Sequence, residues 1–113
     1  DDSEAAFFVA TDETLGDVGV VAGAPYRGRD CAGLFQMWVD PKARGKRVGE
    51  LLIDAVIAWT KENGHTKLIL EVGDDNRSAI RLYERKGFHP TGNTSELDPP
   101  RQHITEHERL LEL

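Results

Sequence analysis

The sequence has little of what several protein classes require. Cys31 is the only cysteine, so no disulfide can form within the chain. No apolar run reaches the ~18 residues of a membrane-spanning helix, and no signal-peptide pattern opens the chain. The net charge of -6 disfavours a general nucleic-acid binder, whose domain would be basic. We therefore expect a cytoplasmic protein with neither nucleic acid nor membrane as a partner.

The chain also lacks an initial Met and much length ahead of its first strand. Its 113 residues suffice for one compact domain, 1–113, that buries about 65% of its unfolded surface. Asp1 to Glu4 come almost directly before an apolar segment. We therefore expect that an N-terminal strand and helices are absent from this chain.

The hydrophobic periodicity predicts a mixed α/β fold. Strands are expected at 5–10, 18–24, 33–39, 67–72, around Phe88 and at 104–113, with helices at 46–63 and 77–86 and a loop at 91–101. Alternation in the third strand places Leu34, Gln36 and Trp38 on one face and Phe35, Met37 and Val39 on the other. The unit from Gly33 to Val72 should be a parallel strand-helix-strand crossover, with the site beyond the carboxyl ends of its strands.

The segment Val39 to Gly49 brings unusual chemistry to the start of the first helix. It contains four cations, Lys42, Arg44, Lys46 and Arg47, in a chain that is acidic overall. Gly45 and Gly49 allow close approach to the backbone, and amides at a helix N-terminus attract anions. The spacing fits neither a Walker loop nor a dinucleotide fingerprint. The segment therefore favours a pyrophosphate site, and the alternative is a solvated basic loop with a glycine for helix packing.

Two motifs resemble those of a known family. Arg44-Gly-Lys-Arg-Val-Gly49 is similar to the acetyl-CoA-binding motif of the GNAT superfamily of N-acetyltransferases. Leu70 to Phe88 resembles the later motif, with its Asn, Ala, Leu-Tyr-Glu and Gly-Phe in order. The ribosomal-protein N-terminal acetyltransferase branch is especially similar. Arg47 departs from the pattern because it stands where a glycine is usual, and we expect an ordinary helical φ there.

The resemblance implies a fold and a set of binding residues. The fold would be a twisted mixed sheet of about six strands flanked by helices, with a splayed parallel strand-helix-strand unit forming the acetyl-CoA cleft. The residues implied to bind acetyl-CoA are Met37, Trp38, Val39, Arg44, Gly45, Lys46, Arg47, Val48, Gly49, Glu50, Asn76 and Tyr83. The backbone of the first three would pair with the pantetheine arm, the loop amides would hold the pyrophosphate, and Asn76 would contact the pantetheine.

The resemblance also implies two catalytic residues, Glu71 as the base and Tyr83 as the acid that protonates the departing thiolate. Independently of it, Glu71 is the only charge within an otherwise apolar stretch, where a carboxylate must be hydrated, paired or functional. Structural alternatives exist for each side chain. Glu71 could face outward by alternation, Tyr83 could pack in the core, and Asn76 could simply cap the second helix.

These features together predict an acetyl-CoA-dependent N-acetyltransferase that moves the acetyl group directly to a primary amine. The alternative is a non-catalytic CoA-binding or regulatory module with the same fold. The expected partner is a small-molecule or peptide amine, and a homodimer is possible. No metal site is expected.

Overall fold

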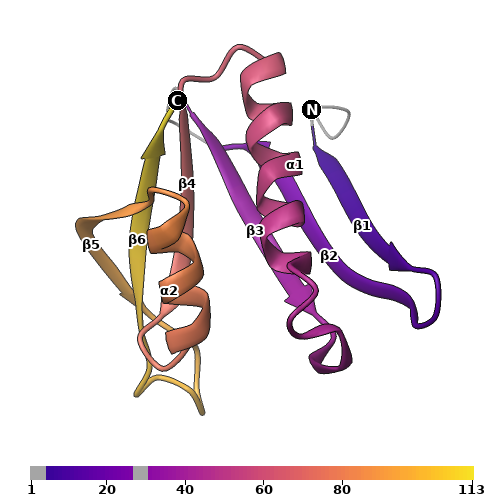
Figure 1. The fold of residues 1–113 in the computed structure, drawn as a ribbon. Coiled ribbons are helices and arrows are strands. Elements are labelled where there is room, and N and C mark those ends of the chain that lie inside the picture. The colour runs from indigo at the N-terminus through magenta and orange to yellow at the C-terminus, as the bar shows by residue number, and fades with distance from the viewer. Residues whose placement is uncertain (1–4, 27–30) are drawn as a thin grey trace.

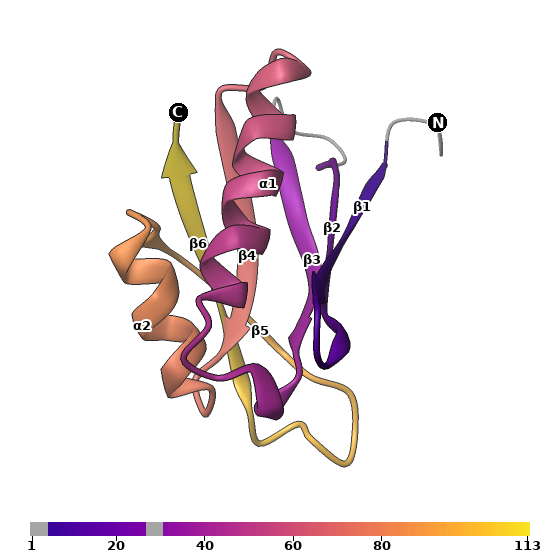
Figure 2. The ribbon, with the colours of Figure 1, turned by 45° about the vertical axis from the view of Figure 1, so that its right-hand side comes forward.

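The computed structural model describes residues 5–26 and 31–113. Its elements are β1 (Ala6–Asp12), β2 (Gly16–Pro25), β3 (Ala32–Val39), the 3-10 turn η2 (Pro41–Ala43), α1 (Val48–Glu62), β4 (Lys67–Gly73), α2 (Arg77–Arg85), β5 (His89–Glu96) and β6 (Thr105–Glu112). The strands form one six-stranded sheet in the order β1-β2-β3-β4-β6-β5. Both helices lie on the same face of this sheet (Figure 1; Figure 2). The predicted mixed six-stranded fold is confirmed.

The parallel strands β3 and β4 separate soon after they begin. They pair only at Ala32 with Leu68 and at Gly33 with Ile69. Towards their carboxyl ends the two ribbons diverge, and α1 lies in front of β2 and β3 (Figure 1). The predicted splayed strand-helix-strand unit is confirmed, and the splay leaves one side of β3 without a neighbouring strand.

A β-bulge in β3 accompanies this separation. Ala22 of β2 pairs with Phe35, but Val20, two residues away, pairs with Trp38, so β3 contains one extra residue. Gln36 in the bulge has φ 55°, in the left-handed region that residues with a Cβ rarely occupy. Bulges bend a strand and re-aim its side chains, often next to active sites. Here the bulge lies immediately before the segment predicted to bind the cofactor.

The bulge makes the predicted alternation of β3 wrong. Leu34 is buried, whereas Trp38, expected on the same face, is 51% exposed. Met37 and Val39 instead pack against the core cluster that contains Leu34. The extra residue shifts the alternation by one position, which a regular period of two does not anticipate.

Two predicted boundaries also differ from the structure. The helix expected from Lys46 begins at Val48, because Arg47 has a left-handed conformation. The expected loop 91–101 overlaps β5, which pairs antiparallel with β6 as an edge strand and has an irregular register between Pro90 and Thr94. All residues of β5 are exposed, so it lacks the apolar alternation that reveals a strand in a sequence.

Two glycines in β2 allow α1 to pack closely on the sheet. A Cβ added at Gly19 would meet side-chain atoms of Leu52 and Val48 at 2.9 Å. A Cβ at Gly23 would meet ring atoms of Trp59, also at 2.9 Å. The glycines therefore set the position of α1, whose Ile53 and Val56 are fully buried. The position of α1 in turn determines where the loop before its N-terminus lies.

We expect Gly23→Ala to lower the free energy of unfolding by about 1–3 kcal/mol, because the added methyl overpacks against the rigid indole of Trp59. In a Trp59→Leu background the same substitution should cost much less, because the obstructing ring is gone. Urea unfolding of the four proteins of this cycle measures the coupling. An equal cost in both backgrounds would contradict the assigned contact.

Candidate active site

A cleft of about 650 Å³ lies between the end of β3, the following loop and α2. Eleven of the twelve residues predicted to bind acetyl-CoA line it, from Met37, Trp38 and Val39 to Asn76 and Tyr83. Lys46 is the exception, and its ammonium pairs with Asp12 at 3.1 Å. The fold thus brings together side chains that are far apart in the sequence, at the end of the sheet where β3 and β4 diverge.

The loop before α1 presents backbone amides to this cleft. Asp40 begins it, since its carboxylate accepts a hydrogen bond from the Lys42 amide at 2.9 Å. Ala43 is buried and anchors the turn, and Gly45 has φ 83°. The first α1 backbone bond runs from the Leu51 amide to the Arg47 carbonyl, and the Arg47 side chain makes no capping bond. The preceding amides of the helix are therefore available to an anion.

Arg47 has φ 61° and ψ 27°, so the expectation of an ordinary helical φ is wrong. This left-handed conformation suits glycine, which explains why glycine is usual at this position of the resembling motif. For a residue with a Cβ it costs roughly 1–2 kcal/mol. The chain therefore carries backbone strain at a residue that also lines the cleft with a cation.

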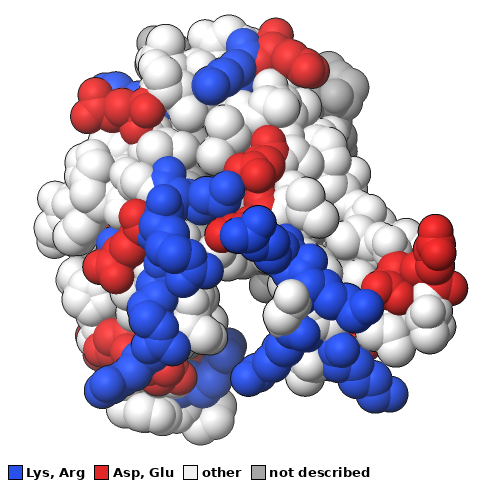
Figure 3. Space-filling view, viewed as in Figure 1, with Lys and Arg blue, Asp and Glu red and all other residues white. Residues whose placement is uncertain are grey.

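Positive side chains gather on both sides of the cleft (Figure 3). Arg44 and Arg47 approach from the loop, and Arg85 approaches from α2. Glu50 lies between the two sides, with a carboxylate oxygen 3.5 Å from Arg47 and another 3.8 Å from Arg85. Sequence reasoning missed Arg85, although the four-residue spacing of Arg77, Arg81 and Arg85 was a signal for one basic helix face.

Asn76 and Tyr83 both lie where α2 borders the cleft. The Asn76 side chain accepts a hydrogen bond from the Ala79 amide at 3.4 Å, so it caps α2 and lines the cleft at the same time. Tyr83 is 6% exposed and packs edge-on against Phe88 with 5.8 Å between ring centroids. Burial raises the pKa of the Tyr83 phenol to about 12, which keeps its proton in place at neutral pH.

Glu71 does not line this cleft. It is exposed, whereas its neighbours Leu70 and Val72 are buried among the core residues under the helices. Glu71 thus occupies the opposite face of β4, as the structural alternative anticipated. Its carboxylate accepts a hydrogen bond from the Ser95 hydroxyl at 3.0 Å, which fixes its orientation on that face.

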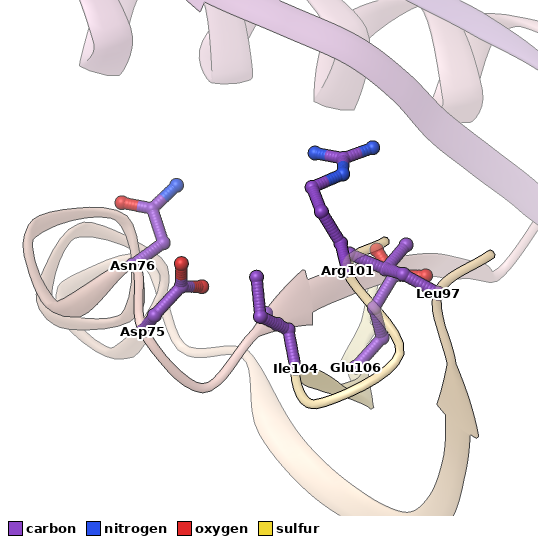
Figure 4. A pocket seen from close by; sticks show the side chains of 7 residues that line it. Asp75, Asn76, Leu97, Arg101, Ile104 and Glu106 are labelled. Atoms are coloured by element: carbon purple, nitrogen blue, oxygen red, sulfur yellow. The ribbon is translucent and has the colours of Figure 1, made fainter. Parts of the chain in front are cut away.

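A second pocket of about 440 Å³ adjoins the carboxyl end of β4 (Figure 4). Its lining residues are Gly73, Asp75, Asn76, Leu97, Arg101, Ile104 and Glu106. Burial, and then the charge of Glu71, raise the pKa of the Glu106 carboxyl, and the Arg101 guanidinium opposes that rise. Sequence reasoning missed this pocket, because the pairing of Gly73 with Glu106 unites segments that no local pattern relates.

The described residues, 5–26 and 31–113, contain neither a metal-binding cluster nor a membrane-spanning helix. No group of three or more His, Cys, Asp or Glu side chains there could hold a metal ion. Within the same ranges, no helix has both the length and the apolar character needed to cross a membrane.

The splayed strands, the open helix N-terminus and the cationic rim together form a site whose charge and free amides suit an anionic ligand. Residues 1–88 match the profile of the Acetyltransferase (GNAT) family, and the chain belongs to that family. It is 34% identical over 83 residues to an uncharacterized N-acetyltransferase of Schizosaccharomyces pombe, covering 74% of this chain and 51% of that protein. It is also 34% identical over 80 residues to N-acetyltransferase family 8 member 2 of Rattus norvegicus, covering 67% and 35%.

A solved structure of nourseothricin acetyltransferase has a similar fold, with a TM-score of 0.90 and 26% identity. The similarity covers 99% of this chain and 67% of that one. The chain spans about half of the S. pombe relative and about a third of the rat relative.

Arg47→Gly should be more stable than Arg47→Ala by about 1 kcal/mol, because both variants remove the cation but only alanine keeps a Cβ at positive φ. The order should reverse at Arg81, an exposed position inside α2, where glycine is about 1 kcal/mol worse than alanine. Thermal unfolding of the four variants tests this sign change. Alanine being preferred at both positions would contradict the left-handed conformation of Arg47.

Proposed function

We propose that the protein is an acetyl-CoA-dependent N-acetyltransferase. The observation that carries this proposal is the cleft at the open ends of β3 and β4, where a strand edge, a basic loop and a buried tyrosine converge. Membership of the GNAT family and the names of the relatives support the same activity.

The residues present fit acetyl-CoA. The amides of Gly45 and of Arg47 to Glu50, together with the Arg44 and Arg47 side chains, would hold the pyrophosphate at the start of α1, whereas the Lys46 amide already donates to the Ala43 carbonyl. The separation from β4 leaves the backbone of Met37 to Val39 open to the pantetheine arm, which would add to the sheet edge as a strand does. Asn76 would face the arm from α2.

In the proposed reaction the amine nitrogen of the acceptor attacks the thioester carbonyl carbon. A C–N bond forms, the C–S bond breaks, and the sulfur leaves with the electron pair. A lysine-like amine with pKa ~10.4 must first lose its proton, at a cost of about 4.6 kcal/mol at pH 7, against about 1.4 kcal/mol for an α-amine near 8. The nitrogen gains a positive charge as the C–N bond forms and must then lose a further proton. We assign removal of that proton to Glu71, acting through water because its carboxylate lies outside the cofactor cleft.

Tyr83 would stabilise the departing sulfur. With a phenol pKa of about 12, complete proton transfer to a thiolate whose thiol has pKa ~8.5 would be uphill by about 5 kcal/mol. A hydrogen bond from the neutral phenol to the developing thiolate costs no such transfer. We therefore refine the expected role of Tyr83 from proton donor to hydrogen-bond donor, with the thiolate taking its proton from solvent.

Thiol release measured with acetyl-CoA and a panel of amines tests the proposed activity. The panel should include peptide N-termini, lysine analogues, polyamines and aminoglycoside-like compounds, since the relatives' names leave the acceptor open. We expect thiol release only when a suitable amine is present. Saturable acetyl-CoA binding without turnover for any amine would favour the non-catalytic CoA-binding alternative. A cytoplasmic location and a homodimer stay predictions.

Tyr83→Phe should lower kcat about 10–100-fold, the value of one charge-assisted hydrogen bond, and leave acetyl-CoA affinity nearly unchanged. The phenylalanine ring keeps the contact with Phe88, so the fold should persist. Tyr26→Phe is the matched control, because Tyr26 lies outside the cleft. Steady-state kinetics and calorimetric titration measure the two effects, and an unchanged kcat in Tyr83→Phe would remove Tyr83 from the mechanism.

Glu71→Gln should lower kcat/KM by roughly 100-fold, because glutamine cannot accept the proton that the amine loses. Rates are expressed per concentration of neutral amine, so that protonation of the acceptor does not affect the comparison. Glutamine can still accept the hydrogen bond from Ser95, and Glu96→Gln on the neighbouring exposed strand is the control. An unchanged kcat/KM in Glu71→Gln would refute the assignment of Glu71 as the base.

A further inference from the structure

Asn76 contributes to the lining of both pockets described above. It lines the cofactor cleft together with Tyr83, and it also lines the smaller pocket together with Asp75 and Glu106. No other residue is common to the two linings. A group that entered the smaller pocket and extended past Asn76 would therefore arrive at the cleft where the thioester is proposed to lie.

The smaller pocket has acidic walls and an apolar side. Asp75 and Asn76 stand on one side, and Leu97, Arg101 and Glu106 stand on the other, with Ile104 between them (Figure 4). Gly73 completes the lining, and a Cβ there would meet the Asp75 carboxylate at 2.7 Å and Ile104 at 3.1 Å. Because Gly73 has no side chain, the pocket stays open beside the Asp75 carboxylate.

Carboxylates outnumber cations around this pocket. Asp75 and Glu106 belong to the lining, where Arg101 is the single cation. Glu71 adds a further negative charge, because it lies on the same face of β4 as Gly73 and acts electrostatically on Glu106. A cationic ligand would relieve this concentration of negative charge, whereas an anionic ligand would add to it.

We propose that the smaller pocket receives the acceptor, and that the acceptor is a diamine or polyamine with an aliphatic spacer. This inference rests on the proposed acetyltransferase function and names the substrate class for that site. One amine passes Asn76 and attacks the thioester. A second, protonated amine stays behind and is held by Glu106 and Asp75, while the spacer lies against Ile104 and Leu97.

The roles of the two glutamates differ in this arrangement. Glu71 removes the proton from the reacting amine, so its loss should affect every acceptor. Glu106 contacts only the distal ammonium, so its loss should affect acceptors that carry a second charge and should leave monoamines unaffected. Glu106 is therefore a specificity-determining residue, and the sequence offered no motif for it.

Cadaverine and pentylamine test this proposal, because they share a five-carbon chain and differ by the distal amine. In the wild-type protein, kcat/KM for cadaverine should exceed that for pentylamine about tenfold or more, the effect of one charge-assisted contact. Glu106→Gln should lower kcat/KM for cadaverine about tenfold, chiefly by raising KM. It should leave kcat/KM for pentylamine within about twofold of the wild-type value. Asp75→Asn should act in the same direction and serves as the second variant.

Glu112→Gln is the matched control, since Glu112 is an exposed glutamate of the same strand β6 outside the pocket. It should change neither acceptor. Equal kcat/KM for the two amines in the wild-type protein, or an equal loss for both in Glu106→Gln, would overturn the inference while leaving the acetyltransferase function intact. Absence of thiol release with every amine would instead refute the proposed function itself.

Discussion

The site depends on one constraint, the inability of β3 and β4 to remain paired. Their ladder ends after Gly33 and Ile69, whereas β3 stays paired with β2 on both sides of the bulge at Gln36. Backbone groups that lose a strand partner need another one, from a ligand, a side chain or water. The separation therefore creates both the space for a ligand and the hydrogen-bonding edge that would hold it.

The charge distribution reinforces this geometry. The chain carries a net charge of -6, yet lysines and arginines crowd the two sides of the cleft (Figure 3). The smaller pocket beyond Asn76 has the opposite character, with Asp75 and Glu106 in its walls. In the proposed function, the cationic cleft would hold the phosphate-bearing donor and the neighbouring acidic pocket would hold the amine. Opposite fields would steer the two substrates to different entrances of one site.

Local patterns sufficed for much of this architecture. The apolar stripe of α1, the buried strand β4 and the cap at Asn76 follow from periodicity and capping chemistry, and the resemblance assigned the cleft-lining residues.

Predictions from the sequence were wrong where tertiary pairing overrides the local pattern. The bulge at Gln36 shifts the alternation of β3, and the left-handed φ of Arg47 delays the start of α1. β5 has no apolar face, so only its pairing with β6 reveals it. Glu106 reaches the smaller pocket through the antiparallel pairing of β6 with β4, which a linear sequence does not show.

An NMR titration with acetyl-CoA is the most direct test of the central claim that this cleft is the cofactor site. Amide shifts of the isotopically labelled protein report each backbone position separately. The account predicts that the largest amide shift changes fall on Met37 to Val39 and on Gly45 to Glu50. Little change is expected along β1, the edge strand that β2 separates from β3. Saturable changes confined to other elements, or no changes at acetyl-CoA concentrations that support turnover, would contradict it.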